Sequence, residues 1–385
     1  MGNNFKMLAK TLFGFEEVLA KELRDLGAQD VAIGTRNVTF TGDTGFMYKA
    51  NLCLRTALKI LKPINTFRVK NEHDLYKGIY AMPWENYLKT NSTFAIESTV
   101  FSDNFNHSQY VVHKTKDAIA DKFRQQSGIR PNIDTEHPNL RINIHIQGDV
   151  CTVSLDSSGG SLHLRGYRTE TNIAPINEVL AAGLILQSGW NAQCDLLDPM
   201  CGSGTFLIEA AMIACNIPAN INRREFGFQH WLDYDEALFG LIENSVLKKV
   251  KNFDYQIIGY DKAPSAVRKA KDNITNANLD EFIKVYERNF FETKKEDEKP
   301  LYLIFNPPYD ERLTVDIESF YAEIGNTLKH GYPNSQAWFI TANAEALKHV
   351  GLRPSRKIKT FNGKLEARFV NYQMYSGSKK LHKNQ

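Results

Sequence analysis

The feature that most constrains this chain is the regular alternation of short apolar strands and helices that begins after Glu170. This alternation predicts an α/β fold in which a parallel sheet is covered by helices on both faces. Helices are expected at 176–188, 206–215, 263–277 and 317–328, and strands at 194–197, 255–260, 282–286, 301–305 and 337–341. Asn362-Gly363 separates two further strand-like runs, 356–361 and 365–375, which predicts an antiparallel hairpin at the end of the sheet.

The part of the chain before Glu170 follows an α+β pattern instead. Helices are expected at 14–27, 45–61 and 108–126, and strands at 31–40, 94–100, 141–146 and 150–155. This part contains no glycine-rich phosphate loop and no cluster of metal-ligand residues in its sequence. Its expected task is therefore binding.

Composition excludes several classes of protein. The chain of 385 residues is 42% hydrophobic and 24% charged, which is usual for a soluble globular protein of more than one domain. We expect no membrane span and no secretory signal, because no apolar run is long enough and the first residues are polar. The 5 cysteines are scattered without a Cys-x-x-Cys pair, so we expect no disulfide framework, no metal site and a reducing, cytoplasmic location.

Charge is uneven along the chain although the net charge is only +3. The stretch from Lys348 to Gln385 holds ten basic residues and a single acidic one, Glu366. A basic segment of this kind suits a phosphate-rich partner, although it is also compatible with a solvated surface.

The first expected strand end leads into the loop Asp198-Pro199-Met200-Cys201-Gly202-Ser203-Gly204-Thr205. Its two glycines let the backbone pass close to a ligand, and the helix that follows offers free N–H groups. The dinucleotide fingerprint needs a third glycine where Leu207 stands, and the Gly-Lys-Ser/Thr of a P-loop is missing. The loop therefore suits a nucleoside that carries no pyrophosphate.

The next strand ends in Asp261, a carboxylate that could accept hydrogen bonds from ribose hydroxyls or could merely cap the following helix. Asp261 follows Gly204 by 57 residues, which is much more than the usual spacing of about 20. A helical insertion over 216–253 would explain the difference.

After the third strand, Asn289 is a candidate for contacting an adenine amine.

The fourth strand runs directly into Asn306-Pro307-Pro308-Tyr309. The two prolines fix the backbone, so the Asn306 side-chain oxygen and the Pro307 carbonyl can act as paired acceptors for one planar NH₂ group. Tyr309 could stack on the ring that carries this amine. An ordinary proline turn is the alternative, and it is disfavoured by the order of the other strand ends.

Together these residues resemble class I S-adenosylmethionine-dependent methyltransferases of the Asn-Pro-Pro-Tyr type. The junction Leu162–Arg168 with Ala174-Pro175 is similar to that of THUMP-domain RNA methyltransferases, specifically the bacterial 23S rRNA guanine-N2 branch, often labelled adenine-specific DNA methylases. The resemblance covers essentially the whole chain. It departs at Leu164 and Asn289, where the family commonly has Lys and Asp.

The resemblance implies a ferredoxin-like domain over 1–62, a THUMP domain over 63–168 and a Rossmann-like methyltransferase domain over 169–385. It also implies roles for the residues quoted above. Asn306, Pro307, Pro308 and Tyr309 would be catalytic, and S-adenosylmethionine (SAM) would be held by Asp198, Pro199, Cys201, Gly202, Ser203, Gly204, Thr205, Asp261, Asn289 and Asn306.

The implied substrate is guanine N2 in RNA, with 23S rRNA favoured. Transfer RNA guanine, adenine N6 and a protein glutamine amide stay open, as does an RNA-binding or chaperone protein without essential catalysis. RNA would be held by the C-terminal hairpin and by the first domains, through Arg124, Arg130, Arg141, Arg165 and Arg168. The chemistry needs no metal.

Overall fold

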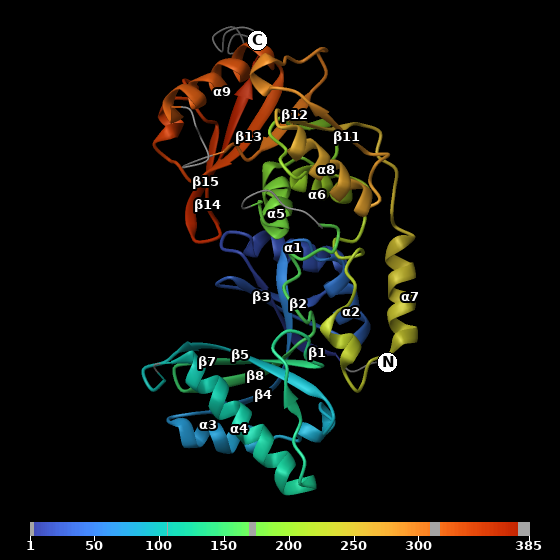
Figure 1. Ribbon diagram of the computed structural model, residues 1–385, viewed down its shortest axis with the longest axis vertical. Coiled ribbons are helices and arrows are strands. Elements are labelled where there is room, and N and C mark those ends of the chain that lie inside the picture. Colours follow the sequence, from blue (N-terminus) through green and yellow to red (C-terminus); the bar gives the residue numbers. More distant parts are fainter. Residues whose placement is uncertain (1–3, 106, 169–174, 309–315, 376–385) are drawn as a thin grey trace. The chain divides into compact units, whose positions relative to one another are not determined.

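A computed structural model describes residues 4–105, 107–168, 175–308 and 316–375 (Figure 1). The chain divides into two compact units. The N-terminal unit comprises residues 1–11, 19–162 and 223–245, and the C-terminal unit comprises 12–18, 163–222 and 246–385. Within the described ranges, no helix is both long and apolar enough to cross a membrane.

The C-terminal unit is built on a seven-stranded sheet in the order β11-β10-β9-β12-β13-β15-β14. The first five strands in this order are parallel, and β15 and β14 form the antiparallel end. The strands are β9 (Asp195–Asp198), β10 (Ile257–Asp261), β11 (Ile283–Glu287), β12 (Leu301–Phe305), β13 (Ser335–Thr341), β14 (Arg356–Asn362) and β15 (Leu365–Met374). The helical segments are α5 (Glu178–Ser188), α6 (Thr205–Ala214), α8 (Pro264–Asn276), η3 (Phe290–Glu292), α9 (Ile317–Gly331) and η5 (Ala346–Lys348). The predicted parallel sheet with an antiparallel C-terminal hairpin is confirmed.

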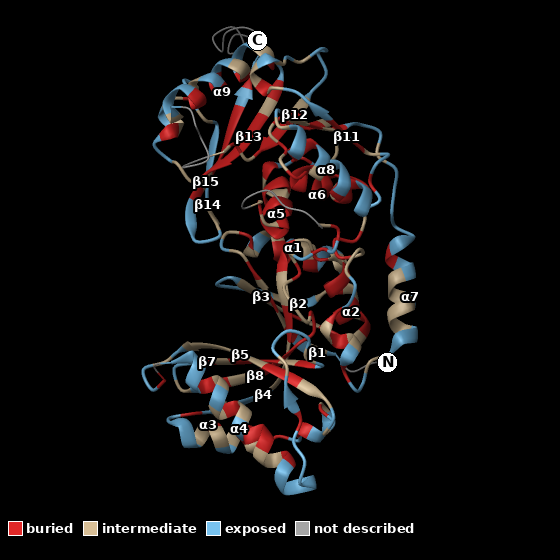
Figure 2. Ribbon diagram, viewed as in Figure 1, coloured by how far each residue is buried: buried red, intermediate tan, exposed pale blue. Residues whose placement is uncertain are grey.

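Neighbouring residues of the central strands enter two different cores, because successive side chains of a strand point to opposite faces. Leu196 and Ile304 pack in the core that contains α5, α6 and α8, whereas Leu197 and Leu303 pack in the core beneath α9. Figure 2 shows β12 and β13 as buried strands. Burial on both faces explains why these strands read as unbroken apolar runs in the sequence.

The N-terminal unit is built on an eight-stranded sheet in the order β2-β3-β1-β4-β8-β7-β5-β6. Its strands are β1 (Phe5–Thr11), β2 (Gln29–Gly34), β3 (Asn37–Gly42), β4 (Ala57–Arg68), β5 (Thr93–Phe101), β6 (Asn132–Ile133), β7 (Leu140–Gln147) and β8 (Val150–Asp156). Its helical segments are α1 (Glu16–Leu26), α2 (Thr44–Cys53), α3 (Glu72–Tyr80), η1 (Trp84–Asn86), α4 (Ser108–Ser127), η2 (Gly227–His230) and α7 (Glu236–Leu247). Because β4 pairs with both β1 and β8, one continuous sheet extends across residue 62, where the boundary between the ferredoxin-like and THUMP domains is predicted.

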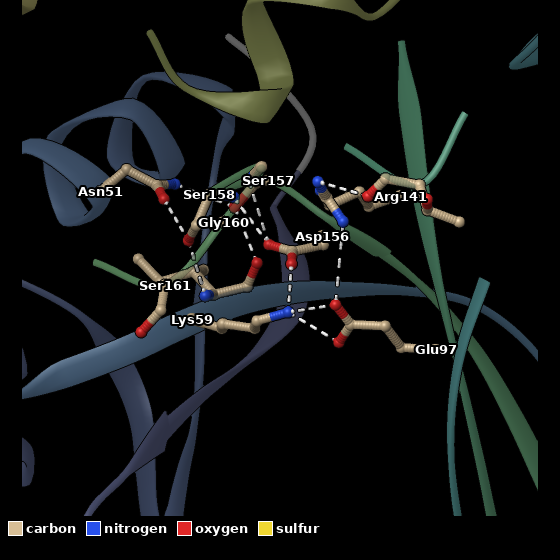
Figure 3. A network of polar contacts seen from close by, with 12 residues as sticks. Asn51, Lys59, Glu97, Arg141, Asp156, Ser157, Ser158, Gly160 and Ser161 are labelled. Carbon is tan, nitrogen blue, oxygen red and sulfur yellow. Dashed lines mark hydrogen bonds and ion pairs between the residues drawn. The ribbon is translucent and has the colours of Figure 1, made fainter. Parts of the chain in front are cut away.

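A polar network that runs from buried Asp156 to exposed Glu97 joins the two halves of this sheet (Figure 3). Lys59 Nζ on β4 lies 2.7 Å from Glu97 Oε2 on β5 and 3.1 Å from Asp156 Oδ2 on β8. Asn51 Nδ2 on α2 donates to Ser157 Oγ just after β8 at 2.9 Å. Burial raises the pKa of the Asp156 carboxyl, which explains why a lysine is needed beside it.

Part of the predicted insertion over 216–253 packs within the N-terminal unit. Its aromatic side chains surround Tyr48 on α2, with Phe228 stacked on the Tyr48 ring at 4.3 Å between centroids. The Tyr48 hydroxyl accepts a hydrogen bond from the Asp235 backbone N–H at 3.1 Å. The aromatic side chains of this segment therefore pack against α2 within the N-terminal unit.

Two sequence-based predictions in the N-terminal unit are wrong. The helix expected over 45–61 ends at Cys53, and Ala57–Arg68 is strand β4, because this segment pairs with strands on both sides. The run expected over 31–40 is two strands joined by a turn in which Arg36 has a φ of +57°. Gly34 and Asn37, which flank Thr35 and Arg36, are the turn residues that mark this break in the sequence.

Gly259 on β10 leaves room for the helix that follows the glycine loop. An added Cβ would lie 2.4 Å from Leu207 Cδ1 and 3.1 Å from Cys201 Sγ, and both of these residues are buried. We expect Gly259→Ala to lower the free energy of unfolding by about 1–3 kcal/mol, measured by urea denaturation. Gly240→Ala on α7 is the control, because nothing lies within 4 Å of its added methyl group. Equal stability of the two variants would contradict this packing account.

Candidate active site

The parallel strands bring the predicted site residues to one edge of the sheet. Asp198 ends β9 and Asp261 ends β10, while Asn289 and Asn306 follow β11 and β12 closely. Parallel pairing of β9, β10 and β12 places their carboxyl ends side by side. The loops over 198–205, 261–263, 287–290 and 305–308 therefore border a common site.

The loop between β9 and α6 is shaped by its two glycines. Gly202 and Gly204 have φ angles of +54° and +83°, which a residue with a side chain adopts only with strain. The Ser203 carbonyl accepts a hydrogen bond from Asn273 Nδ2 on α8 at 3.0 Å, and the Cys201 N–H donates to the Tyr260 carbonyl at 2.9 Å. These bonds fix the loop beside β10 and α8.

Asp198 starts this loop as a buried side chain. Its Oδ1 accepts a hydrogen bond from the Met200 N–H at 3.1 Å, and Pro199 lies between them. Burial raises the pKa of Asp198 well above its usual range. Asp198 therefore acts in the interior as a support of the loop.

The Asp261 carboxylate joins two segments of the site. One oxygen accepts a hydrogen bond from the Gly202 N–H at 3.0 Å, and the other accepts from the Ala263 N–H at 2.9 Å. A carboxylate has about four acceptor positions, so capacity for further hydrogen bonds remains on both oxygens. Asp261 thus combines the two alternatives drawn from the sequence, since it supports the chain before α8 and still offers acceptors to a ligand.

Asn306 begins the loop after β12, where it is half-buried. Its Oδ1 is buried and has no hydrogen-bond partner among the described residues. An unpaired buried acceptor costs about 1–3 kcal/mol, so this oxygen can take a hydrogen bond from a donor outside the described residues. Pro307 is buried and Pro308 half-buried, whereas Tyr309 lies outside the described residues.

Asn289 has local partners. Its Oδ1 accepts from the Phe291 N–H at 3.3 Å, and its Nδ2 donates to Glu292 Oε1 at 2.8 Å. The side chain therefore caps η3. Its predicted contact with an adenine amine would require these bonds to be shared or broken.

Arg165, predicted to bind RNA, lies instead inside the C-terminal unit. Its side chain is 0% exposed, with Nε 3.3 Å from Glu209 Oε1 on α6. Its Nη1 also donates to Asn220 Oδ1 at 3.1 Å. Because its guanidinium is buried and paired, Arg165 offers no surface to a phosphate, and we remove it from the RNA-binding set. The single acid in the apolar segment of α6, Glu209, was the sequence signal for a buried partner.

Arg168 supports the glycine loop. Its Nη2 donates to Thr205 Oγ1 at 2.7 Å, and Thr205 directly follows Gly204. Its Nε lies 3.3 Å from Glu178 Oε1 on α5. No local pattern predicts this bridge, because Arg168 and Thr205 are far apart in the chain.

The remaining predicted RNA contacts lie in the N-terminal unit. Arg124 near the end of α4 and Arg130 after it are exposed, and Arg124 pairs with Asp121 at 3.0 Å. Arg141 on β7 donates to the Glu136 carbonyl at 2.8 Å and lies 3.9 Å from Glu97 (Figure 3). Exposure leaves Arg124 and Arg130 accessible to an anionic partner, whereas Arg141 is largely engaged.

Protonation of Glu178 makes the free energy of unfolding depend on pH. Burial raises its pKa to about 7, and the neighbouring Arg168 opposes that shift. The native state therefore keeps a proton that the unfolded chain releases above its ordinary pKa of 4.5, so this contribution to stability falls as pH rises from about 4.5 to 7.

We expect Glu178→Gln to flatten this part of the stability profile, by up to about 3 kcal/mol, in urea unfolding measured between about pH 5 and 7.5. Glu323→Gln, at an exposed position on α9, is the control. If the Glu178→Gln and wild-type profiles run in parallel, Glu178 does not carry the raised pKa.

Comparison with known families gives matches over most of the chain. Residues 165–371 match the family described as the RMKL-like methyltransferase domain. Residues 69–156 match the THUMP domain, and residues 6–61 match the RlmL ferredoxin-like domain. The resemblance identified from the sequence is confirmed.

Two curated relatives carry the name ribosomal RNA large subunit methyltransferase K/L. The protein of Syntrophotalea carbinolica is 37% identical over 382 residues, which cover 96% of this chain and 53% of the relative. The protein of Cellvibrio japonicus is 37% identical over 377 residues, which cover 94% of this chain and 50% of the relative. The chain thus spans about half the length of these relatives.

Solved structures match over nearly the whole chain. The crystal structure of SMU.472 in complex with SAH has a TM-score of 0.86 and 31% identity, covering 98% of this chain and 100% of that one. The structure of a predicted N6-adenine-specific DNA methylase from Listeria monocytogenes has a TM-score of 0.86 and 26% identity, covering 97% of each chain. From its fold, the geometry of its strand ends and these matches, the chain belongs to the RMKL-like methyltransferase family, with RlmL ferredoxin-like and THUMP domains.

Proposed function

We propose that this protein transfers a methyl group from SAM to the exocyclic N2 amine of a guanine in RNA, with 23S rRNA as the substrate. One observation carries the proposal: Asn306 Oδ1 is buried at the carboxyl edge of the sheet without a partner among the described residues. An amine donor placed there would satisfy it.

The residues around the glycine loop fit SAM. Gly202 and Gly204 give the loop its left-handed turns, and Gly204 lets it pack closely on α8, since an added Cβ would lie 3.3 Å from Ala270 Cβ. The Asp261 carboxylate keeps acceptor capacity for ribose hydroxyls. The relative SMU.472 binds SAH, the demethylated product of SAM, which supports the same ligand here.

When bound, SAM supplies a methyl group on a sulfonium, which needs an aligned nucleophile. The chain's task is therefore alignment, which can lower a barrier by roughly 7–11 kcal/mol. Asn306 Oδ1 and the Pro307 carbonyl accept the two amine hydrogens and so orient the nitrogen lone pair. Accepting those hydrogens also favours the pyramidal nitrogen of the transition state, where its positive charge develops.

Ribosomal RNA is favoured as the substrate by the names of the curated relatives and by the THUMP match. A base inside a duplex cannot reach the edge of a sheet, so we expect an unpaired or flipped nucleotide. Arg124 and Arg130 are accessible for its backbone in the N-terminal unit. A cytoplasmic location is part of this proposal, and it is supported by the ribosomal names of the relatives and by the free cysteine thiols, which suit a reducing compartment.

Adenine N6 is the second candidate, because the Listeria relative is described as an N6-adenine-specific DNA methylase. The pair of acceptors at Asn306 and Pro307 accommodates the NH₂ group of either base.

Mass spectrometry of nucleosides from ribosomal and transfer RNA of a deletion strain separates the two candidate substrates, guanine N2 and adenine N6. We expect loss of N2-methylguanosine from 23S rRNA, restored by the wild-type gene. An unchanged nucleoside profile, or loss of a methylated adenine alone, would contradict the proposal.

We expect Asn306→Ala to reduce methyl transfer by at least about 100-fold, because one oriented acceptor of the amine is removed. Affinity for SAH should change less than several-fold in isothermal calorimetry, which shows that the cofactor site is intact. Methylation at the wild-type rate, measured with radiolabelled SAM on RNA from the deletion strain, would refute the assigned role.

We expect Asp261→Ala to weaken SAH binding by about 10- to 100-fold, because the variant loses both the Gly202 support and the acceptors for ribose. Asp272→Ala is the matched control, since Asp272 is an exposed acid on α8. An unaltered dissociation constant for Asp261→Ala would place the ribose partner elsewhere.

A further inference from the structure

We propose that the β14–β15 hairpin is the surface on which the C-terminal unit holds the phosphate backbone of its substrate, next to the target nucleotide. This inference rests on the proposed function, because it takes the substrate to be RNA. It assigns a binding role to an element that contributes none of the site residues described above.

The hairpin and the turn before it are strongly basic. Between positions 353 and 368 the sequence contains six basic residues and one acidic residue, Glu366. The exposed members are Arg353, Arg356, Lys357, Lys359 and Lys364, and Arg368 is half-buried. Such density of one sign on a short element matches a polyanion.

Glu366 leaves most of this charge uncompensated. Its carboxylate lies 2.7 Å from Lys359 Nζ and 2.9 Å from Arg368 Nη2. These two cations lower the pKa of Glu366, with the Lys359 hydrogen bond contributing most. Glu366 is therefore the shared ion-pair partner of Lys359 and Arg368. Lys357 and Lys364 have no ion-pair partner among the described residues.

Strand register puts this charge close to the catalytic edge. Phe305, the last residue of β12, pairs with Phe339 on β13. Asn306 therefore lies one residue beyond this pair, in the direction in which β12 and β13 run. β15 is the neighbour of β13 on the other side, so it lies two strand spacings, roughly 10 Å, from β12.

The hairpin continues beyond the level of Asn306. Thr341 on β13 lies opposite Arg368, and Arg368 lies opposite Lys359 on β14. Because Thr341 is two residues past Phe339, this cross-strand row already lies beyond the first residue of the catalytic loop. The turn between Asn362 and Leu365 extends further in the same direction (Figure 1).

Exposed apolar side chains lie on the hairpin and beside it. Leu365, at the start of β15, is 50% exposed, and Phe13, in the segment between β1 and α1, is 40% exposed. The Phe13 ring meets the Phe361 ring edge to face, with 5.5 Å between centroids, and Lys359 Nζ lies 5.6 Å from the Phe361 centroid. Aromatic rings among lysines are typical of surfaces that bind single-stranded nucleic acid through stacking and charge.

Lysines on an edge strand also discourage pairing of strands from different copies. That role would not require Lys364, which lies in the turn, nor the exposed apolar side chains beside it. Charge and apolar surface together favour an RNA backbone with unpaired bases as the occupant.

The test removes three charges at the hairpin in a Lys357→Gln, Lys359→Gln, Lys364→Gln variant of the full chain. The control removes three charges in a Lys271→Gln, Lys284→Gln, Lys299→Gln variant. These control lysines are exposed, and Lys284 lies on β11, at the opposite edge of the same sheet. Both variants therefore have the same net charge. The readouts are binding to a fluorescein-labelled single-stranded RNA across salt concentrations and methylation kinetics on 23S rRNA.

We expect the hairpin variant to bind RNA about 10- to 50-fold more weakly near 0.15 M salt, with a salt slope lower by about 2. Its KM for RNA should rise while kcat and SAH affinity stay near wild type, and the control should change less than about threefold. Equal binding by both variants, or self-association of the hairpin variant with unchanged RNA affinity, would overturn the inference. A wild-type protein that binds no RNA would instead refute the proposed function.

Discussion

Parallel pairing of five strands is the constraint on which the rest of the molecule depends. Strands that run in the same direction must all end at one edge, so the residues that follow them meet there whatever their distance in sequence. Asp198 and Asp261 meet at this edge although a long insertion separates them. The same pairing brings Asn306 to the neighbouring position.

Buried ionic contacts hold this edge in place from the interior. Arg168 connects Glu178 on α5 with Thr205 at the start of α6, and Arg165 is paired with Glu209 within α6. A buried charge that loses its partner costs about 3–5 kcal/mol, so these pairs tolerate little change. The unpaired Asn306 oxygen differs from them, because its partner must come from outside the described chain.

Sequence reasoning succeeded where the signal was local. Apolar runs that are buried on both faces predicted the strands of the C-terminal sheet, and Asn362-Gly363 predicted its hairpin. The structure brings the glycine loop, Asp261 and Asn306 to one edge of the sheet, as their positions after successive strands predict, while their roles stay a prediction. Family comparison then confirmed the methyltransferase resemblance.

Errors arose where tertiary partners decide the outcome. Ala57–Arg68 became a strand because β1 and β8 flank it, which no local pattern reveals. Arg165 carries the charge of an RNA-binding residue, but Glu209 and Asn220 hold it in the interior.

The central claim is that Asn306 presents its free oxygen to an amine beside the methyl donor. A crystal structure of the protein with SAH bound tests this most directly. The account predicts that Asn306 Oδ1 faces the SAH sulfur across a gap that accommodates one nucleobase amine, with Asp261 at the ribose. An Asn306 side chain that points away from the sulfur, or a gap closed by the protein's own side chains, would contradict it.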